Sequence, residues 1–217
     1  MLIDNDVIIK VALYGLGPAF MEVTAPQGTP PAILNVGRFV VRDRLNRDKR
    51  FVNKTAAIEC FDALLPNLAL LEPSDEELAA AAEFEMLATR ANLDLDGGES
   101  QLLAILLTRM GNLLITGDKR AIHAIALIAS GETQGKLACF EQLIASILTL
   151  VDTNIIRRRV CLEPFADKAT TICCSCASER ALSTSDLLEA IDSYTRHVRS
   201  GAAGTLLESH DLSALAA

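Results

Sequence analysis

The stretch LLITGDKRAI at residues 113–122 joins the end of a strand to the start of a helix. Its first apolar run stops at Thr116 and Gly117, and Asp118 then precedes two cations and a second apolar segment. A short apolar run, a turn and a helical pattern together are typical of one unit of a parallel sheet. We therefore expect Asp118 at the carboxyl end of a strand, where it caps the next helix or binds a ligand.

Similar patterns alternate along the chain before this stretch and just after it. We expect a first short strand that ends at Asp4, and three further strands in LALLEP (68–73), NLLIT (112–116) and KLACF (136–140). Helices are expected at about residues 7–16, 32–48, 54–65, 74–91, 99–111, 118–130 and 141–151. The segment 18–31 holds four prolines and is predicted to be a loop. The alternation predicts an α/β fold with a mainly parallel central sheet flanked by helices.

The pattern changes after residue 151. Residues 152–217 are rich in cysteine and short polar residues, and SDLLEAIDSYTRHV (185–198) predicts one more helix. The last 17 residues, 201–217, show no strong core pattern and are expected to pack loosely. We therefore predict a first domain at 1–151 and a mostly helical, cysteine-containing extension at 152–217.

The overall composition limits the class of protein. The chain has 217 residues, half of them apolar, which is enough for a substantial core. No apolar run approaches the roughly 18 residues that cross a bilayer, and the opening MLID lacks the basic start of a signal peptide. We expect a soluble, cytoplasmic protein with no membrane partner.

The charge distribution allows local binding of nucleic acid. A net charge of −8 argues against general coating of nucleic acid, but RFVVRDRLNRDKR (38–50) carries six cations and two acids. Arg38 and Arg42 are expected to share one helix face and bind substrate, with Phe39 and Val40 turned toward the core. The alternative is that this run is a solvated helix face.

Three acids are predicted to meet at one edge of the sheet. Asp4 and Asp118 follow strands, and Glu99 opens the helix that leads into the second of these strands. Carboxylates that converge repel one another unless a cation lies between them, and hard oxygen ligands favour Mg²⁺ or Mn²⁺. Taken singly, each acid could instead cap a helix or complement its dipole.

Three motifs carry a resemblance to the PIN-domain nucleases over about residues 1–145. LIDNDVIIK (2–10) is similar to the family's opening strand and helix, LDGGESQLLAILL (95–107) to its Leu-Asp-x-Gly-Glu segment, and LLITGDKRAI to its closing strand. The resemblance implies a three-layer fold and an Mg²⁺- or Mn²⁺-dependent ribonuclease acting on RNA. It also implies, as open possibilities, an antitoxin-type protein partner and a homodimer. The implied catalytic residues and metal ligands are Asp4, Glu99 and Asp118, with Asp6, Asp96 and Thr116 as supporting residues.

Two other interpretations remain open. Asp4-Asn5-Asp6-Val7 also resembles the nucleophile motif of haloacid-dehalogenase-type phosphatases, in which Asp4 would be the nucleophile and Asp6 the general acid. That hypothesis leaves Glu99 without a role. The other alternative is a PIN-like protein that has lost activity and serves as a nucleic-acid-binding protein or scaffold.

The cysteines of the extension allow two structures. Cys161, Cys173, Cys174 and Cys176 could supply a tetrahedral zinc site, but one stands alone and three lie within four residues, unlike two separated Cys-x-x-Cys pairs. We therefore predict reduced, mostly buried thiols that pack the extension onto the first domain.

Overall fold

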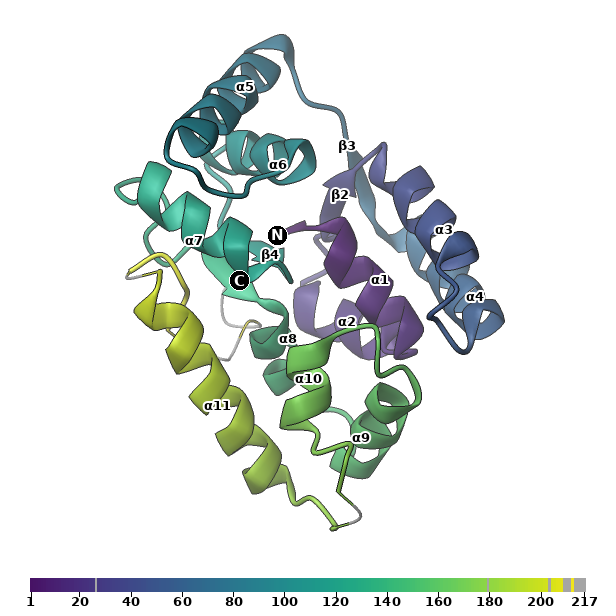
Figure 1. Cartoon of the computed structure of the whole chain (residues 1–217). Helices are drawn as coiled ribbons and strands as arrows, with labels where there is room; N and C mark the ends of the chain where they lie inside the picture. Colours follow the sequence, from purple (N-terminus) through teal and green to yellow (C-terminus); the bar gives the residue numbers. More distant parts are fainter. Residues whose placement is uncertain (26, 179, 203, 209–211, 213–217) are drawn as a thin grey trace.

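The protein is an α/β structure built on a five-stranded parallel sheet (Figure 1). The structure is a computed structural model that describes residues 1–25, 27–178, 180–202, 204–208 and 212. The strand order is β3-β2-β1-β4-β5, and every pairing is parallel. The strands are β1 (Leu2–Ile3), β2 (Ala32–Leu34), β3 (Ala69–Leu71), β4 (Leu114–Thr116) and β5 (Leu137–Cys139). The predicted fold class is confirmed.

Helices cover both faces of this sheet and continue into the extension (Figure 1). They are α1 (Asn5–Leu13), α2 (Gly17–Thr24), α3 (Gly37–Arg47), α4 (Lys54–Leu64), the 3₁₀ turn η1 (Leu65–Asn67), α5 (Asp75–Arg90), α6 (Gly97–Thr108), α7 (Lys119–Ile128), α8 (Phe140–Ile147), α9 (Thr153–Leu162), α10 (Lys168–Cys173) and α11 (Thr184–Ser200). Within the described ranges, none of these helices has the length and apolar character needed to span a bilayer.

Successive side chains of β1, β2, β4 and β5 alternate between two different cores. In β1, Leu2 joins the cluster formed with α6 and α7, whereas Ile3 joins the cluster formed with α1, α2, α4 and α8. In β4, Leu114 and Ile115 are divided between the same two clusters. Strands that are buried on both faces read as continuous apolar runs, which explains why LLIT and LAC lack a polar alternation. The result is the three-layer arrangement that was expected.

Two predictions for residues 17–36 were wrong. The Pro-rich segment contains helix α2, because Pro18 lies in the first turn, where the missing N–H costs no helical hydrogen bond. The predicted helix at 32–48 begins instead as strand β2, and α3 starts only at Gly37. A buried run of three apolar residues cannot be assigned to strand or helix by periodicity alone.

Helix α3 is rotated relative to the sequence-based prediction. Phe39 is 60% exposed and Val40 is 45% exposed, so neither turns toward the core. Val41 and Leu45, four residues apart, are the fully buried side chains of this helix. Basic residues surround this narrow buried stripe, so α3 presents a largely polar surface to solvent.

The extension packs into the core of the sheet. Ile156 and Val160 of α9 and Leu187 of α11 belong to the same buried cluster as Ile3 and Ile115 of the sheet. Beyond α11, Leu206 forms a parallel bridge with Leu137 at the edge of β5 and is buried. The expectation of a loosely packed tail is therefore wrong for Thr205, Leu206 and Leu212, which are buried, while residues 203, 209–211 and 213–217 lie outside the described part.

The extension also contains a disulfide, which corrects the prediction that its thiols are reduced. Cys161 at the end of α9 is bonded to Cys176 just after α10. Cys173 and Cys174 are free and buried, as predicted for packing thiols. The sequence could not separate these pairs, because pairing depends on how the turn after α9 brings two distant Cβ atoms together.

Candidate functional site

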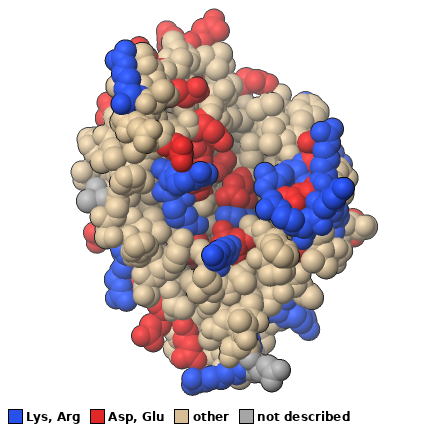
Figure 2. Space-filling view, in the orientation of Figure 1, with Lys and Arg blue, Asp and Glu red and all other residues tan. Residues whose placement is uncertain are grey.

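The carboxyl ends of β1 and β4 open into a cleft of about 840 Å³. The chain order reverses here, since β2 and β3 lie on one side of β1 whereas β4 and β5 lie on the other. Ligands of open parallel sheets bind at such points. Figure 2 shows an acidic hollow at this place, flanked by Lys and Arg side chains on either side. The cleft is lined by all five acids singled out in the sequence, Asp4, Asp6, Asp96, Glu99 and Asp118.

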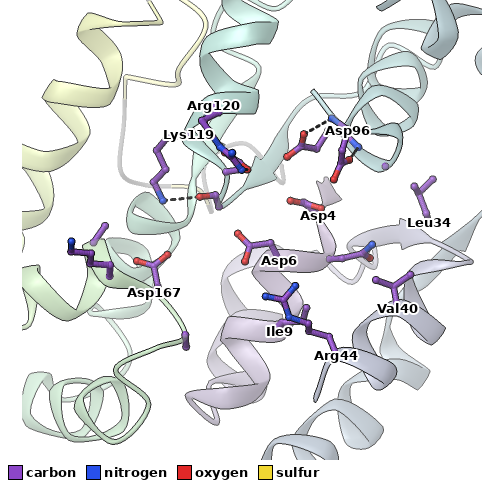
Figure 3. A pocket seen from close by; sticks show the side chains of 18 of the residues that line it. Asp4, Asp6, Ile9, Leu34, Val40, Arg44, Asp96, Lys119, Arg120 and Asp167 are labelled. Carbon is purple, nitrogen blue, oxygen red and sulfur yellow. Dashed lines mark hydrogen bonds and ion pairs between the residues drawn. The ribbon is translucent and has the colours of Figure 1, made fainter. Parts of the chain in front are cut away.

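Asp4 is buried and does not cap the helix that it precedes. It occupies the N-cap position of α1, yet its carboxylate accepts no cap hydrogen bond and instead accepts one from Thr116 Oγ1 at 2.9 Å. Burial, followed by repulsion from Asp6, raises the pKa of Asp4 to about 6. In Figure 3 its side chain points into the cleft toward Asp96. Helix capping therefore does not explain why an acid stands at this position.

Glu99 is held at the N-terminus of α6 by a reciprocal capping box. The Asp96 N–H donates to Glu99 Oε2 at 3.0 Å, and the Glu99 N–H donates to Asp96 Oδ1 at 2.9 Å. Burial, with added repulsion from Asp96 and Asp4, raises the pKa of Glu99 to about 8. This residue has a clear capping role, and with a pKa of about 8 its carboxyl group is mostly protonated at neutral pH.

Asp118 is the most solvated of the three predicted ligands. Its carboxylate caps α7 by accepting the Arg120 N–H at 2.8 Å, and the Arg120 guanidinium lies 2.8 Å from its second oxygen. Burial alone would raise the pKa of Asp118, but the hydrogen bonds from Arg120 outweigh it and lower the pKa. Asp118 is thus a helix cap, as the alternative proposed, and it also lines the cleft.

The available donors fit a hard divalent cation. The candidate ligands are all carboxylates, and within the described residues no Lys or Arg forms an ion pair with Asp4 or Glu99. As placed, no three His, Cys, Asp or Glu side chains of the described residues are grouped so as to hold an ion. Each acid uses a local partner instead, namely Thr116, the Asp96 N–H or Arg120.

Beside the acidic centre, two lysines form ion pairs with neighbouring acids. Lys10 Nζ lies 2.9 Å from Asp6 Oδ2 and 2.5 Å from Asp167 Oδ2, and Asp167 comes from the turn before α10 in the extension. Lys119 Nζ lies 2.7 Å from Glu141 Oε1, so the two form an ion pair. The geometry of this contact does not meet the criteria for a hydrogen bond. Asp6 therefore differs from Asp4, because a buried ammonium already compensates its charge.

The basic surface beside the cleft differs in detail from the predicted one. Arg44 of α3 lines the cleft, whereas Arg38 and Arg42 do not. Arg42 is paired with Asp62 of α4. The extension adds Lys168, and α7 adds Lys119 and Arg120, so cations line the cleft from three elements. Substrate binding by Arg38 and Arg42 stays a prediction.

Comparison of the chain with protein-family models, with curated proteins and with solved structures found no match. The likeness to the PIN-domain nucleases therefore rests on the three motifs and on what their residues can do where they lie.

Three residues of the cleft region were missed from the sequence. Lys10 had a signal, because it follows Asp6 by four residues on one helix face. Arg44 was hidden in a run of six cations whose orientation depends on the rotation of α3. Asp167 had no local signal, since only the packing of the extension brings it to Lys10.

Proposed function

We propose that this protein is an Mg²⁺- or Mn²⁺-dependent phosphodiesterase of the PIN-domain type that hydrolyses RNA. The observation that carries the proposal is Asp4, a buried carboxylate at the end of the central strand that caps no helix and faces a second buried acid, Glu99. A buried acid without a cationic partner is costly, and a bound divalent cation removes that cost.

In this proposal Asp4, Glu99 and Asp118 hold the ion. The ion supplies a more acidic bound water and a positive charge beside the phosphate oxygens. The protein contributes the orientation of the ligands, because Thr116 holds Asp4 and the capping box holds Glu99. Arg44 and Lys168 at the rims attract the phosphates of the substrate. The choice of RNA over DNA follows from the family resemblance alone.

Purified protein incubated with labelled RNA and DNA, with Mg²⁺, Mn²⁺ or EDTA, tests the proposal. We expect RNA cleavage with either metal and none with EDTA, and Asp4→Asn should abolish cleavage while the far-UV circular dichroism stays unchanged. Asp152→Asn, which removes an acid of the extension outside the cleft, is the matched control. Cleavage that persists in EDTA or in Asp4→Asn would refute the proposal.

The same preparation separates the alternatives. A haloacid-dehalogenase-type phosphatase would hydrolyse p-nitrophenyl phosphate and form an aspartyl adduct at Asp4, which mass spectrometry detects. An inactive binding protein would bind RNA without cleaving it. The antitoxin-type partner and the homodimer stay predictions.

A further inference from the structure

Lys10 is a buried cation held between two acids from distant parts of the chain. Its side chain is 5% exposed, and its Nζ contacts Asp6 from the same helix and Asp167 from the extension. The Asp167 side chain is itself only 7% exposed. In Figure 3, Asp6 lies between Asp4 and Asp167, so it stands where the acidic centre meets the ion-paired half of the cleft.

The backbone after β4 is shaped to admit this ion pair. A Cβ atom on Gly117 would overlap both Asp6 Oδ2 and Lys10 Nζ. The Gly117 carbonyl also accepts a hydrogen bond from Lys119 Nζ at 2.8 Å. Gly117 thus leaves room for the Asp6–Lys10 pair directly beside the turn that presents Asp118.

The second acid holds Lys10 firmly. Asp167 caps α10 by accepting the Thr170 N–H at 2.7 Å, so the position of its carboxylate is tied to a helix N-terminus. The neighbouring Glu163 accepts the Val52 and Asn53 N–H groups, which fixes the same turn of the extension to the segment before α4. Displacing Lys10 from Asp6 would leave a buried ammonium with half of its compensation.

We propose that the Lys10 ammonium takes the place of a second divalent cation, so that the site binds one ion, on the side of Asp4 and Glu99. This inference rests on the proposed function and adds the number of metal ions. The extension has a role in it, because Asp167 keeps Lys10 against Asp6. An ion bound at Asp6 would meet an ammonium already 2.9 Å from that carboxylate.

Manganese binding to the full chain tests the inference without relying on activity. Isothermal titration calorimetry with Mn²⁺ gives the number of ions bound, and electron paramagnetic resonance of free Mn²⁺ checks that number independently. Both should give about one ion per wild-type chain. Lys10→Met removes the resident cation and leaves Asp6 and Asp167 uncompensated, so it should bind about two ions. The double variant Lys10→Met/Asp167→Asn should return to about one. Lys136→Met, which removes a half-buried lysine outside the cleft, should keep the wild-type stoichiometry.

A second variant guards against misfolding of Lys10→Met. Asp6→Asn removes a partly exposed acid whose charge Lys10 already balances, so the affinity for Mn²⁺ should change by less than about threefold. Two ions per wild-type chain, one ion in folded Lys10→Met, or a loss of more than about tenfold in affinity in Asp6→Asn would each overturn the inference. Two ions together with RNA cleavage would refute only this inference. Absence of both Mn²⁺ binding and cleavage would refute the proposed function with it.

Discussion

At the scale of single residues, position in a helix does not decide function. Asp4 and Asp118 both occupy N-cap positions after strands of the same sheet. Only Asp118 uses its carboxylate as a cap, and Asp4 turns to Thr116 instead. The two residues therefore need different tests. For Asp118, the test must distinguish a contribution to metal binding from its contribution to helix capping.

Asp118→Asn separates these roles. Asparagine caps helices about as well as aspartate, so the free energy of unfolding should change by less than about 1 kcal/mol. If Asp118 holds the ion, RNA cleavage should fall about 100-fold or more. Initial rates and urea unfolding measure the two effects.

The control for this variant is Asp152→Asn in the extension. Asp152 caps α9 by accepting the N–H two residues later, as Asp118 does for α7, but it lies outside the cleft. It should retain both stability and cleavage. Equal activity in the two variants would reduce Asp118 to a cap.

At the scale of elements, α3 provides one wall of the cleft. Its buried stripe of Val41 and Leu45 sets the rotation that brings Arg44 to the cleft and leaves Phe39 in solvent. Arg42 is paired with Asp62 and Arg44 with Asp48, the latter at 3.3 Å, but of the two only Arg44 lines the cleft. The contribution of each arginine to substrate binding therefore depends on how α3 packs, and the number of basic residues in the helix does not predict it.

Arg44→Ala should weaken RNA binding by removing one phosphate contact. The slope of log K against log salt should flatten by about 0.7, the value for one contact with a single strand. Fluorescence anisotropy at several salt concentrations, in EDTA, measures binding without cleavage. Arg47→Ala is the matched control, because Arg47 is on the same helix, paired with Asp43 and outside the cleft. The Arg38→Ala/Arg42→Ala variant tests the sequence-based hypothesis, and a larger effect there than in Arg44→Ala would contradict the assignment of Arg44.

At the scale of the whole molecule, the acidic centre opposes folding when it is ionised. The pKa of Asp4 rises from 3.8 to about 6 on folding, so in that pH range the folded state binds more protons than the unfolded state. The free energy of unfolding therefore decreases as pH rises from about 4 to about 6 on account of this group. At about 1.4 kcal/mol per pKa unit, Asp4 alone accounts for up to about 3 kcal/mol.

Comparison of wild type with Asp4→Asn isolates this effect from the other acids. In EDTA, raising the pH from 4 to 8 should destabilise the wild type more than the variant. The free energy of unfolding of Asp4→Asn minus that of the wild type should therefore increase by about 1 to 3 kcal/mol. Adding Mn²⁺ at pH 8 should raise the melting temperature of the wild type and leave that of the variant unchanged. A difference that does not vary with pH would contradict the placement of Asp4 in an uncompensated acidic centre.

The sequence predicted well whatever depends on short-range pattern. Alternating apolar runs and helical periods predicted the parallel α/β sheet, and the carboxyl ends of its strands indicated that Asp4 and Asp118 lie at one edge, where both line the cleft. That they share an ion with Glu99 stays a prediction. The predictions of the sheet and of this edge both depend on local pattern. In a parallel sheet, the residue directly after a strand lies at the carboxyl edge, whichever strand it follows. Glu99 was found differently, from its place at the start of a helix and from the resemblance of LDGGESQLLAILL to the family segment.

Only the tertiary structure decided the features that join distant segments. The Cys161–Cys176 bond and the Asp167–Lys10 ion pair each depend on how the extension folds back onto the sheet. The rotation of α3 depends on which two of its apolar residues meet the core. A single sequence gives the chemistry of such residues but not the distances between them. Those distances depend on the packing of many side chains, and no single side chain determines that packing.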